Sequence, residues 1–148
     1  MISKKSKYAL GALVHLAKKY GVGPVLISTI SENEKIPQKF LESILLDLRN
    51  AGYVSSKKQK GGGYYLIKDP EKINIADVLR HFEGAIALLP CVTFKYYEKC
   101  EECKDEMTCS IREAFEEVRN ASVRIFKNHT LFSLIEREQE LLQKKGFR

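Results

Sequence analysis

No cysteine occurs outside residues 91–109, and no apolar run approaches the roughly 20 residues that a membrane-spanning helix requires. The amino-terminal stretch MISKKSKYAL also lacks the uninterrupted apolar region and the small-residue cleavage site of a secretory signal. We therefore expect a cytoplasmic protein without a membrane partner. Because the cytoplasm keeps thiols reduced, the clustered cysteines favour metal binding or redox chemistry over a structural disulfide framework.

Recognisable catalytic motifs are missing as well. The three histidines, His15, His81 and His129, are scattered, and no motif pairs any of them with a nucleophile. The glycine triplet at residues 61–63 is not followed by the Gly-Lys-Ser/Thr of a phosphate-binding loop. The sequence CEEC is not surrounded by the βαβ pattern of a thioredoxin-like enzyme. We therefore expect that the protein is not an enzyme.

The excess of positive over negative charge is confined to the first half of the chain. Residues 1–72 carry 13 Lys and Arg against 6 Asp and Glu, whereas residues 73–148 carry 12 against 13. Such an asymmetry indicates a half that binds a polyanion, joined to a half with another task.

Three helices are predicted within the basic half. The first lies in residues 6–20, the second is short and centres on residues 26–30, and the third begins at Pro37 and stops at Gly52. Helical spacing of apolar residues predicts their buried faces, which are Leu10, Leu13, Leu16, Ala17 and Tyr20, then Leu26, Ile27 and Ile30, then Phe40, Leu41, Ile44, Leu45 and Leu48. A short helix, a tight turn and a longer amphipathic helix together describe a helix-turn-helix.

A β-hairpin is predicted directly after the third helix. In YVSSKKQKGGGYYLI, Tyr53 and Val54 enter a strand, three glycines turn the chain, and residues 64–67 form the returning strand. A hairpin in this position is the wing of a winged helix. The glycines and the lysines of its tip could form only a tight, solvated turn, but the preceding helix pair and the charge bias favour contact with double-stranded DNA.

The amino-terminal part of the third helix is expected to enter the major groove. Its Gln, Lys and Glu side chains are suited to adenine, guanine and the cytosine amino group respectively. The start of the first helix and the wing are expected to contact the phosphate backbone. The candidate DNA-contacting residues are Ser6, Lys7, Gln38, Lys39, Phe40, Glu42, Ser43, Lys57, Lys58, Lys60, Gly61, Gly62, Gly63 and Tyr64.

These stretches, with Tyr8-Ala9 in the first helix, the Gly-Gly-Gly-Tyr wing and Glu83-Gly84 before a cysteine-bearing loop, resemble the Rrf2 family of bacterial winged-helix transcriptional regulators. That family includes iron–sulfur, nitric-oxide and cysteine-metabolism regulators. The resemblance implies a mainly α fold with a two-stranded wing and a long C-terminal dimerisation helix. It also implies a homodimer on a near-palindromic operator. The expected parts are a DNA-binding domain (1–83), a cysteine-rich sensor loop (84–110) and the dimerisation and C-terminal helices (111–148).

A long amphipathic helix is predicted after the cysteines. Its apolar stripe consists of Ile111, Ala114, Phe115, Val118, Ser122 and Ile125, and a further apolar helix, LFSLIEREQELL, follows a break at residues 128–129. Such a stripe ordinarily packs in the core of its own chain. The resemblance favours instead a seam between two copies of the chain.

All four cysteines lie in one loop, with the spacing Cys91-x8-Cys100-x2-Cys103-x5-Cys109. Thiolates are soft ligands, and four of them can complete either a zinc site or an iron–sulfur site. Cluster-binding members of the family carry cysteines in the same loop. This chain departs from them in three ways: Cys100 is additional, the first interval is longer, and non-ligating residues, Arg112 and Lys7, stand where branches of the family place a ligand. The resemblance therefore implies an all-cysteine [4Fe–4S] or [2Fe–2S] site.

Two alternatives to the cluster stay open. Four thiolates could hold a structural zinc ion, or the thiols could be metal-free and either inert or reversibly oxidised. Five neighbouring carboxylates, at 98, 101, 102, 105 and 106, should raise the pKa of the thiols by like-charge repulsion. The sequence thus predicts a DNA-binding regulator tuned by a cluster that senses redox state, iron, nitric oxide or sulfur. The alternative is a winged-helix regulator controlled by a protein partner or a small metabolite.

Overall fold

The amino-terminal helices form where the apolar spacing predicts them. The computed structural model describes residues 2–146 and contains α1 (Lys4–Ala17), α2 (Ile27–Glu34) and α3 (Gln38–Asn50). Ser3 caps α1 by accepting a hydrogen bond from the backbone N–H of Ser6. The turn between α2 and α3 contains a left-handed residue, Lys35, with φ 53°.

The predicted buried faces are mostly correct. Eight of the predicted side chains lie in the domain core and are at most 6% exposed, namely Leu13, Leu16, Ala17, Ile30, Leu41, Ile44, Leu45 and Leu48. Three predictions are wrong, because Tyr20, Leu26 and Phe40 are 45%, 55% and 48% exposed. Tyr20 lies beyond the end of α1 and Leu26 precedes α2 as its N-cap, so neither continues the helical face to which it was assigned.

The predicted hairpin is present and follows α3 directly. Strands β1 (Val54–Lys57) and β2 (Gly63–Leu66) pair antiparallel, and a bridge between Val25 and Tyr64 adds the segment before α2 to this sheet. The winged helix-turn-helix is therefore confirmed, and the fold is mainly α with a two-stranded wing.

The end of the chain returns to this domain. After η1 (Pro70–Lys72) and α4 (Ile75–Glu83), residues 84–109 lead away from the domain and the long α5 (Ser110–Asn128) returns to it. The last helix, α6 (Leu131–Gly146), packs against α1 and η1. The first residue of α6, Leu131, is completely buried in the domain core.

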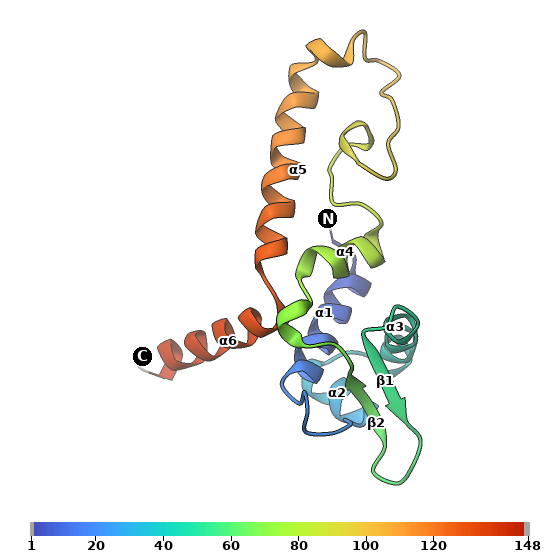
Figure 1. Ribbon diagram of the computed structural model, residues 1–148, viewed down its shortest axis with the longest axis vertical. Coiled ribbons are helices and arrows are strands. Elements are labelled where there is room, and N and C mark those ends of the chain that lie inside the picture. Colours follow the sequence, from blue (N-terminus) through green and yellow to red (C-terminus); the bar gives the residue numbers. More distant parts are fainter. Residues whose placement is uncertain (1, 147–148) are drawn as a thin grey trace.

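Residues 84–109 and α5 form a stalk that projects from the domain (Figure 1). Residues 84–109, which include η2 (Pro90–Val92) and η3 (Glu106–Thr108), run beside α5 to its far end, where the helix begins. At the base of the stalk, the backbone carbonyl of His129 accepts a hydrogen bond from the N–H of Ile75, and the N–H of Leu131 donates to the carbonyl of Ile73, each at 2.9 Å. Within residues 2–146, none of the helices has the length and apolarity needed to cross a bilayer.

Candidate DNA-binding surface and cysteine loop

The amino-terminal turns of α3 are exposed on the face away from the core. Gln38, Lys39, Glu42 and Ser43 all face solvent, whereas the intervening Leu41 is fully buried. This alternation follows from the helical period, which sends the apolar stripe inward and the polar residues outward. The geometry leaves four polar side chains available for base edges in a major groove.

Phe40 lies beside these polar residues and is not part of the core. Its ring packs edge-on against Tyr8 of α1, with 5.9 Å between ring centroids, and it remains 48% exposed. Contact with a neighbouring helix fixes the ring while leaving half of its surface uncovered. An exposed, fixed aromatic ring on this face is suited to contact a thymine methyl group.

At the start of α1 one of the predicted contacts is wrong. Ser6 is completely buried, and its hydroxyl donates a hydrogen bond to Oε1 of Glu83 at the end of α4. Ser3 also donates to that oxygen, through its N–H at 2.8 Å and its hydroxyl at 2.6 Å. These hydrogen bonds lower the pKa of Glu83. Ser6 is thus committed to holding α1 on α4, whereas Lys7 is exposed and stays a predicted phosphate contact.

The wing presents its three lysines to solvent. Lys57, Lys58 and Lys60 are exposed, and the Lys57 ammonium lies 5.8 Å from the centre of the Tyr65 ring. Tyr64 is half-buried, and its backbone N–H and carbonyl pair with Val25.

The wing glycines have steric reasons to be glycine. A Cβ on Gly62 would lie 2.2 Å from the carbonyl oxygen of Lys57, and one on Gly63 would lie 2.2 Å from that of Val25. Gly61 has φ +80°, which favours glycine. The triplet therefore shapes the turn, and its contact with DNA stays a prediction.

The four cysteines occupy the loop and the two elements that it joins. Cys91 is 9% exposed within η2, Cys100 is exposed, Cys103 is half-buried, and Cys109 is the N-cap of α5. All four are free thiols. Among residues 2–146 no three metal-ligating side chains are grouped closely enough to hold an ion. The donor chemistry fits a thiolate site, but the loop has to close before four sulfur atoms can share one.

The thiols differ in their electrostatic surroundings. The Cys100 thiol donates a hydrogen bond to Oε2 of Glu102 at 3.2 Å, and this bond raises the pKa of Cys100, in the direction expected from the acidic neighbours. Desolvation, and then the proximity of Cys109, raise the pKa of Cys103. Cys109 accepts a hydrogen bond from the N–H of Arg112 at 3.4 Å, so its sulfur lies at the positive end of α5.

Sequence reasoning missed Arg119, the only buried side chain of α5. Arg119 donates through Nη1 to the carbonyl oxygen of Val92, and its guanidinium carbon lies 4.0 Å from the centre of the Phe94 ring. Helical spacing could have indicated its burial, because Arg119 lies four residues after Phe115 and three before Ser122, within the predicted apolar stripe. It anchors the first part of the cysteine loop on the helix.

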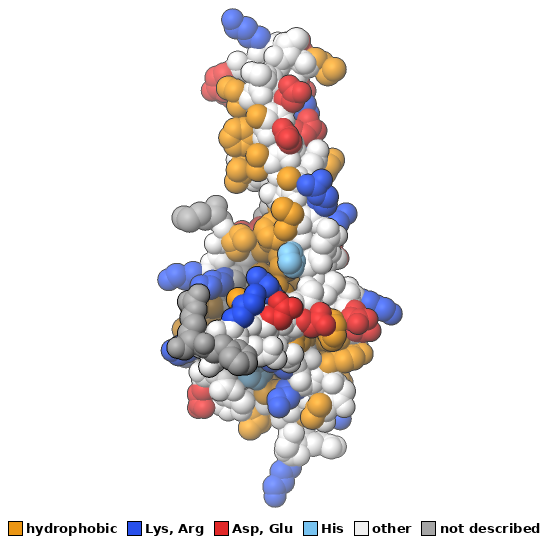
Figure 2. Space-filling view, turned by 90° about the vertical axis from the view of Figure 1, so that its left-hand side faces the viewer, with side chains coloured by type: hydrophobic (Ala, Val, Ile, Leu, Met, Phe, Trp, Pro, Cys, Tyr) orange, Lys and Arg blue, Asp and Glu red, His pale blue; other side chains and the backbone are white. Residues whose placement is uncertain are grey.

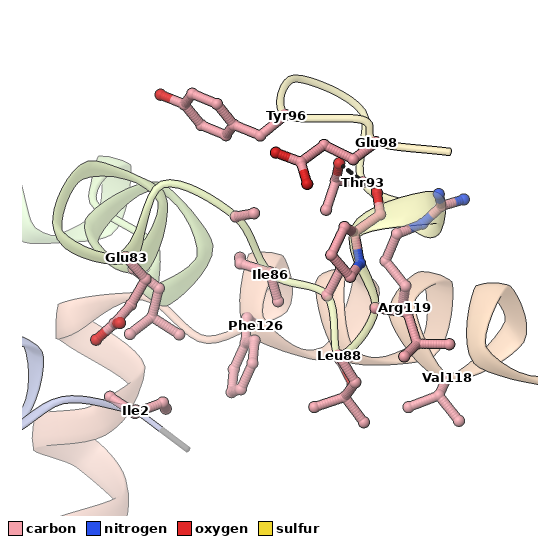
Figure 3. Close-up of a pocket in the computed structure, with 16 residues that line it drawn as sticks. Ile2, Glu83, Ile86, Leu88, Thr93, Tyr96, Glu98, Val118, Arg119 and Phe126 are labelled. Carbon is pink, nitrogen blue, oxygen red and sulfur yellow. Dashed lines mark hydrogen bonds between the residues drawn. The ribbon is translucent and has the colours of Figure 1, made fainter. Parts of the chain in front are cut away.

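A cavity of about 620 Å³ lies between the loop and α5. Apolar side chains form most of its wall, among them Ile86, Leu88, Val118 and Phe126. Figure 3 shows Arg119 pointing up toward the loop, while its neighbour Val118 points the opposite way.

The remaining apolar stripe of α5 is not covered by its own chain. Ile111, Val118 and Ile125 are 65%, 46% and 51% exposed. Figure 2 shows hydrophobic side chains gathered along the stalk. Exposed apolar patches of this kind mark interaction sites in soluble proteins.

Comparison with known proteins gives one consistent result. The model of the Rrf2 family, described as an iron-dependent transcriptional regulator, matches residues 2–137. An rrf2-like HTH-type transcriptional regulator of Rhodobacter capsulatus is 43% identical over 121 residues, 80% of this chain and 81% of the relative. The HTH-type transcriptional regulator CymR of Bacillus subtilis is 35% identical, over 82% of this chain and 84% of its own length.

Solved structures agree with this result over most of the chain. CymR, the global cysteine regulator of B. subtilis, superposes with a TM-score of 0.78 at 31% identity, covering 93% of this chain and 97% of its own. IscR of T. potens superposes with a TM-score of 0.74 at 25% identity, covering 95% and 90%.

Proposed function

Because the chain belongs to the Rrf2 family of transcriptional regulators, we propose that it binds a near-palindromic operator as a homodimer and that an iron–sulfur cluster held by its cysteine loop tunes this binding. The observation that carries the proposal is the exposed amino-terminal face of α3, which lies in one small domain with a lysine-tipped wing. Membership of a family of transcriptional regulators favours a cytoplasmic location.

Sequence is read by the exposed face of α3. Gln38 pairs with adenine, Lys39 with guanine and Glu42 with the cytosine amino group, and Ser43 accepts or donates to any of them. Phe40 contacts a thymine methyl group. Lys7 and the wing lysines bind phosphates, which supplies affinity without sequence preference.

The dimer forms through the stripe that α5 leaves uncovered. Val118 is 46% exposed and also lines the cavity beside the loop, so a second α5 placed there buries both the stripe and the open side of the cavity. Two copies related by a two-fold axis present two copies of α3 to half-sites spaced by about one DNA turn or a multiple of it.

Cys91, Cys100, Cys103 and Cys109 are the proposed ligands of a [4Fe–4S] or [2Fe–2S] cluster. Four soft donors in one loop suit such a cluster, and the iron dependence in the description of the matching family model supports this choice over zinc. When bound, the cluster supplies a group that responds to iron supply, redox state or nitric oxide.

The cysteine loop is connected to the DNA-binding domain at its start and to the proposed dimerisation helix at its end. At its start, Glu83 accepts the hydrogen bonds of Ser3 and Ser6, which begin α1 and lie beside Lys7. At its end, Cys109 caps the helix proposed to make the dimer. A loop that closes therefore moves both the start of α1 and the seam that spaces the two copies of α3.

The test is anaerobic purification followed by iron and sulfide analysis and by footprinting of the metal-loaded and metal-free protein. We expect a brown protein with equal iron and sulfide, one protected near-palindromic site, and different operator affinities for the two forms. Protection of no preferred site by either form would refute DNA regulation. A protected site together with equal affinities would refute only the tuning by a cluster.

A second candidate function keeps the DNA site but replaces the cluster. No three of the thiols are grouped as metal ligands among the described residues, and the chain is similar to CymR, a cysteine regulator. In this alternative the cysteines hold a structural zinc ion or no metal, and a protein partner or a small metabolite sets the affinity. Colourless protein with one zinc ion per chain, or reversible oxidation of metal-free thiols, would favour it.

A further inference from the structure

Arg119 is buried, although no other side chain of α5 is. Its side chain is 6% exposed, and it lies about 14 Å along the α5 axis from Ser110. Arginine is seldom fully buried unless its donors are paired. Its burial here therefore has to be explained by what it binds.

All three nitrogens of the Arg119 guanidinium have hydrogen-bond partners, and these lie on two segments. Within α5, Nε and Nη2 donate to Oδ1 of Asn120 at 3.1 and 2.8 Å, and Nη2 donates to Oε1 of Glu116 at 3.1 Å. Across to the loop, Nη1 donates to the Val92 carbonyl, and the plane faces the Phe94 ring at 4.0 Å. The partners on α5 fix the guanidinium in one orientation, in which it binds Val92 and Phe94 of the loop.

The held carbonyl belongs to the residue next to Cys91. Cys91 is accordingly 9% exposed, whereas Cys100 is exposed and its thiol is hydrogen-bonded to Glu102, two residues away. One thiol of the loop is therefore fixed on the helix, and another lies on a segment without such an anchor.

We propose that Arg119 is the positioning residue of Cys91: it presents this thiol at a fixed place on α5, onto which the segment carrying Cys100 and Cys103 closes. This inference rests on the proposed thiolate site. The role is that of an outer-shell partner, which orients a ligand without touching the metal. Arg119 fixes the backbone on one side of Cys91 before a metal binds. It therefore reduces the conformational entropy that the cysteine loop loses when the metal site forms.

The first test measures how readily Cys91 is alkylated in metal-free protein. Arg119→Met removes the donors while retaining an unbranched side chain, and Arg124→Met, at an exposed position of the same helix, is the matched control. With N-ethylmaleimide and peptide mass analysis, we expect Cys91 to react at least about tenfold faster in Arg119→Met than in wild type or the control. Cys100 should react at one rate in all three proteins.

An unchanged rate at Cys91, in an Arg119→Met protein that keeps its helical circular dichroism, would overturn the inference. Should that variant fail to fold, Phe94→Ala replaces it, because Phe94 is 76% exposed and contacts the guanidinium from the loop side. Here a smaller rise, about threefold, is expected at Cys91, and no rise would overturn the inference.

The second test uses Co²⁺, whose thiolate complexes absorb visible light, as the metal probe under anaerobic conditions. Outer-shell substitutions typically weaken metal binding about 10–100-fold, and we expect a loss of that size for Arg119→Met. Equal Co²⁺ affinity in Arg119→Met and wild type would overturn the positioning of a ligand. If wild type takes up no Co²⁺, the proposed thiolate site fails, while the alkylation result still decides whether Arg119 positions Cys91.

Discussion

The amino-terminal domain and the stalk differ in how far they bury their apolar side chains. In the domain, α1, α2, α3 and the first residue of α6 bury one continuous core, whose large side chains are almost completely inaccessible. In the stalk, α5 buries a single side chain, an arginine, and leaves its apolar stripe exposed. A domain that buries its own apolar surface can be rigid. A stalk whose apolar surface is covered only when another group binds can change its structure in response to that group.

The largest effect is expected where the stalk is proposed to meet a second copy. Val118→Glu places a charge in the exposed stripe, so the dimer should dissociate and operator affinity should fall about 100-fold or more, since linkage of the two half-sites is lost. Sedimentation and operator titration measure both quantities. Arg124→Glu puts the same carboxylate on another face of α5 and should leave the dimer intact; equal sedimentation of the two variants would contradict the seam.

A core substitution tests the other side of the comparison. Leu45 is completely buried in α3, and Leu45→Ala should lower the free energy of unfolding by about 2–5 kcal/mol. Ile111, 65% exposed at the tip of the stalk, should change it by less than about 0.5 kcal/mol when replaced by alanine, at protein concentrations where the chain is monomeric. Urea unfolding measures both, and similar losses would remove the distinction between the two regions.

The wing should contribute affinity without sequence preference. Replacing Lys57, Lys58 and Lys60 by alanine should weaken binding to all duplexes and flatten log K against log salt by about 0.9 for each lost phosphate contact. Alanine at Lys144 and Lys145, on the exposed end of α6, is the control with a similar change in charge. An unchanged salt slope in the wing variant would exclude phosphate contact by these lysines.

Phe40 is expected to contribute specificity. Phe40→Ala should reduce operator affinity by about 1 kcal/mol, and deoxyuridine in place of the contacted thymine should cost wild type a similar amount. Because both changes remove the same methyl contact, deoxyuridine should have no further effect on the variant. Additive losses in this double-mutant cycle would show that Phe40 touches no thymine methyl group.

The smallest effect concerns the contact between α4 and α1. The hydrogen bonds from Ser3 and Ser6 lower the pKa of Glu83, so the stability that they supply is present above the pKa of the unfolded chain and is lost as the pH falls through the folded value. Wild type should therefore be more stable than Glu83→Gln near neutral pH, and the difference should shrink between about pH 5 and pH 3. If the difference in the free energy of unfolding between the two proteins stays constant over this range, the pKa of Glu83 is not lowered in the folded protein.

Sequence reasoning succeeded where one local pattern decides the structure. The period of 3.6 residues identified Leu41, Ile44, Leu45 and Leu48, and the glycine triplet identified the turn of the wing. The pattern failed for Phe40, because spacing alone does not say where an apolar stripe ends and an exposed face begins. It also failed for Tyr20, because the helix ends three residues earlier.

The site was less predictable because long-range contacts decide it. Ser6 is buried by Glu83, 77 residues away, and Arg119 is buried by Val92, 27 residues away. No local pattern pairs Glu83 with Ser6 or Val92 with Arg119. Cysteine spacing gave the donor set, but the path of the loop determines which thiol is anchored and which is exposed.

The backbone of His129 is hydrogen-bonded to Ile75, the first residue of α4, and that of Leu131 to Ile73, just before it. These two bonds hold one end of the 19-residue α5 at the domain, so the helix can act as a lever that pivots there. Its arm is about 28 Å long, so a tilt of about 5° displaces the tip by about 2.5 Å. Successive base pairs of a duplex are about 3.4 Å apart. In the proposed dimer, a tilt of this size would shift the two DNA-binding domains by most of one base-pair step.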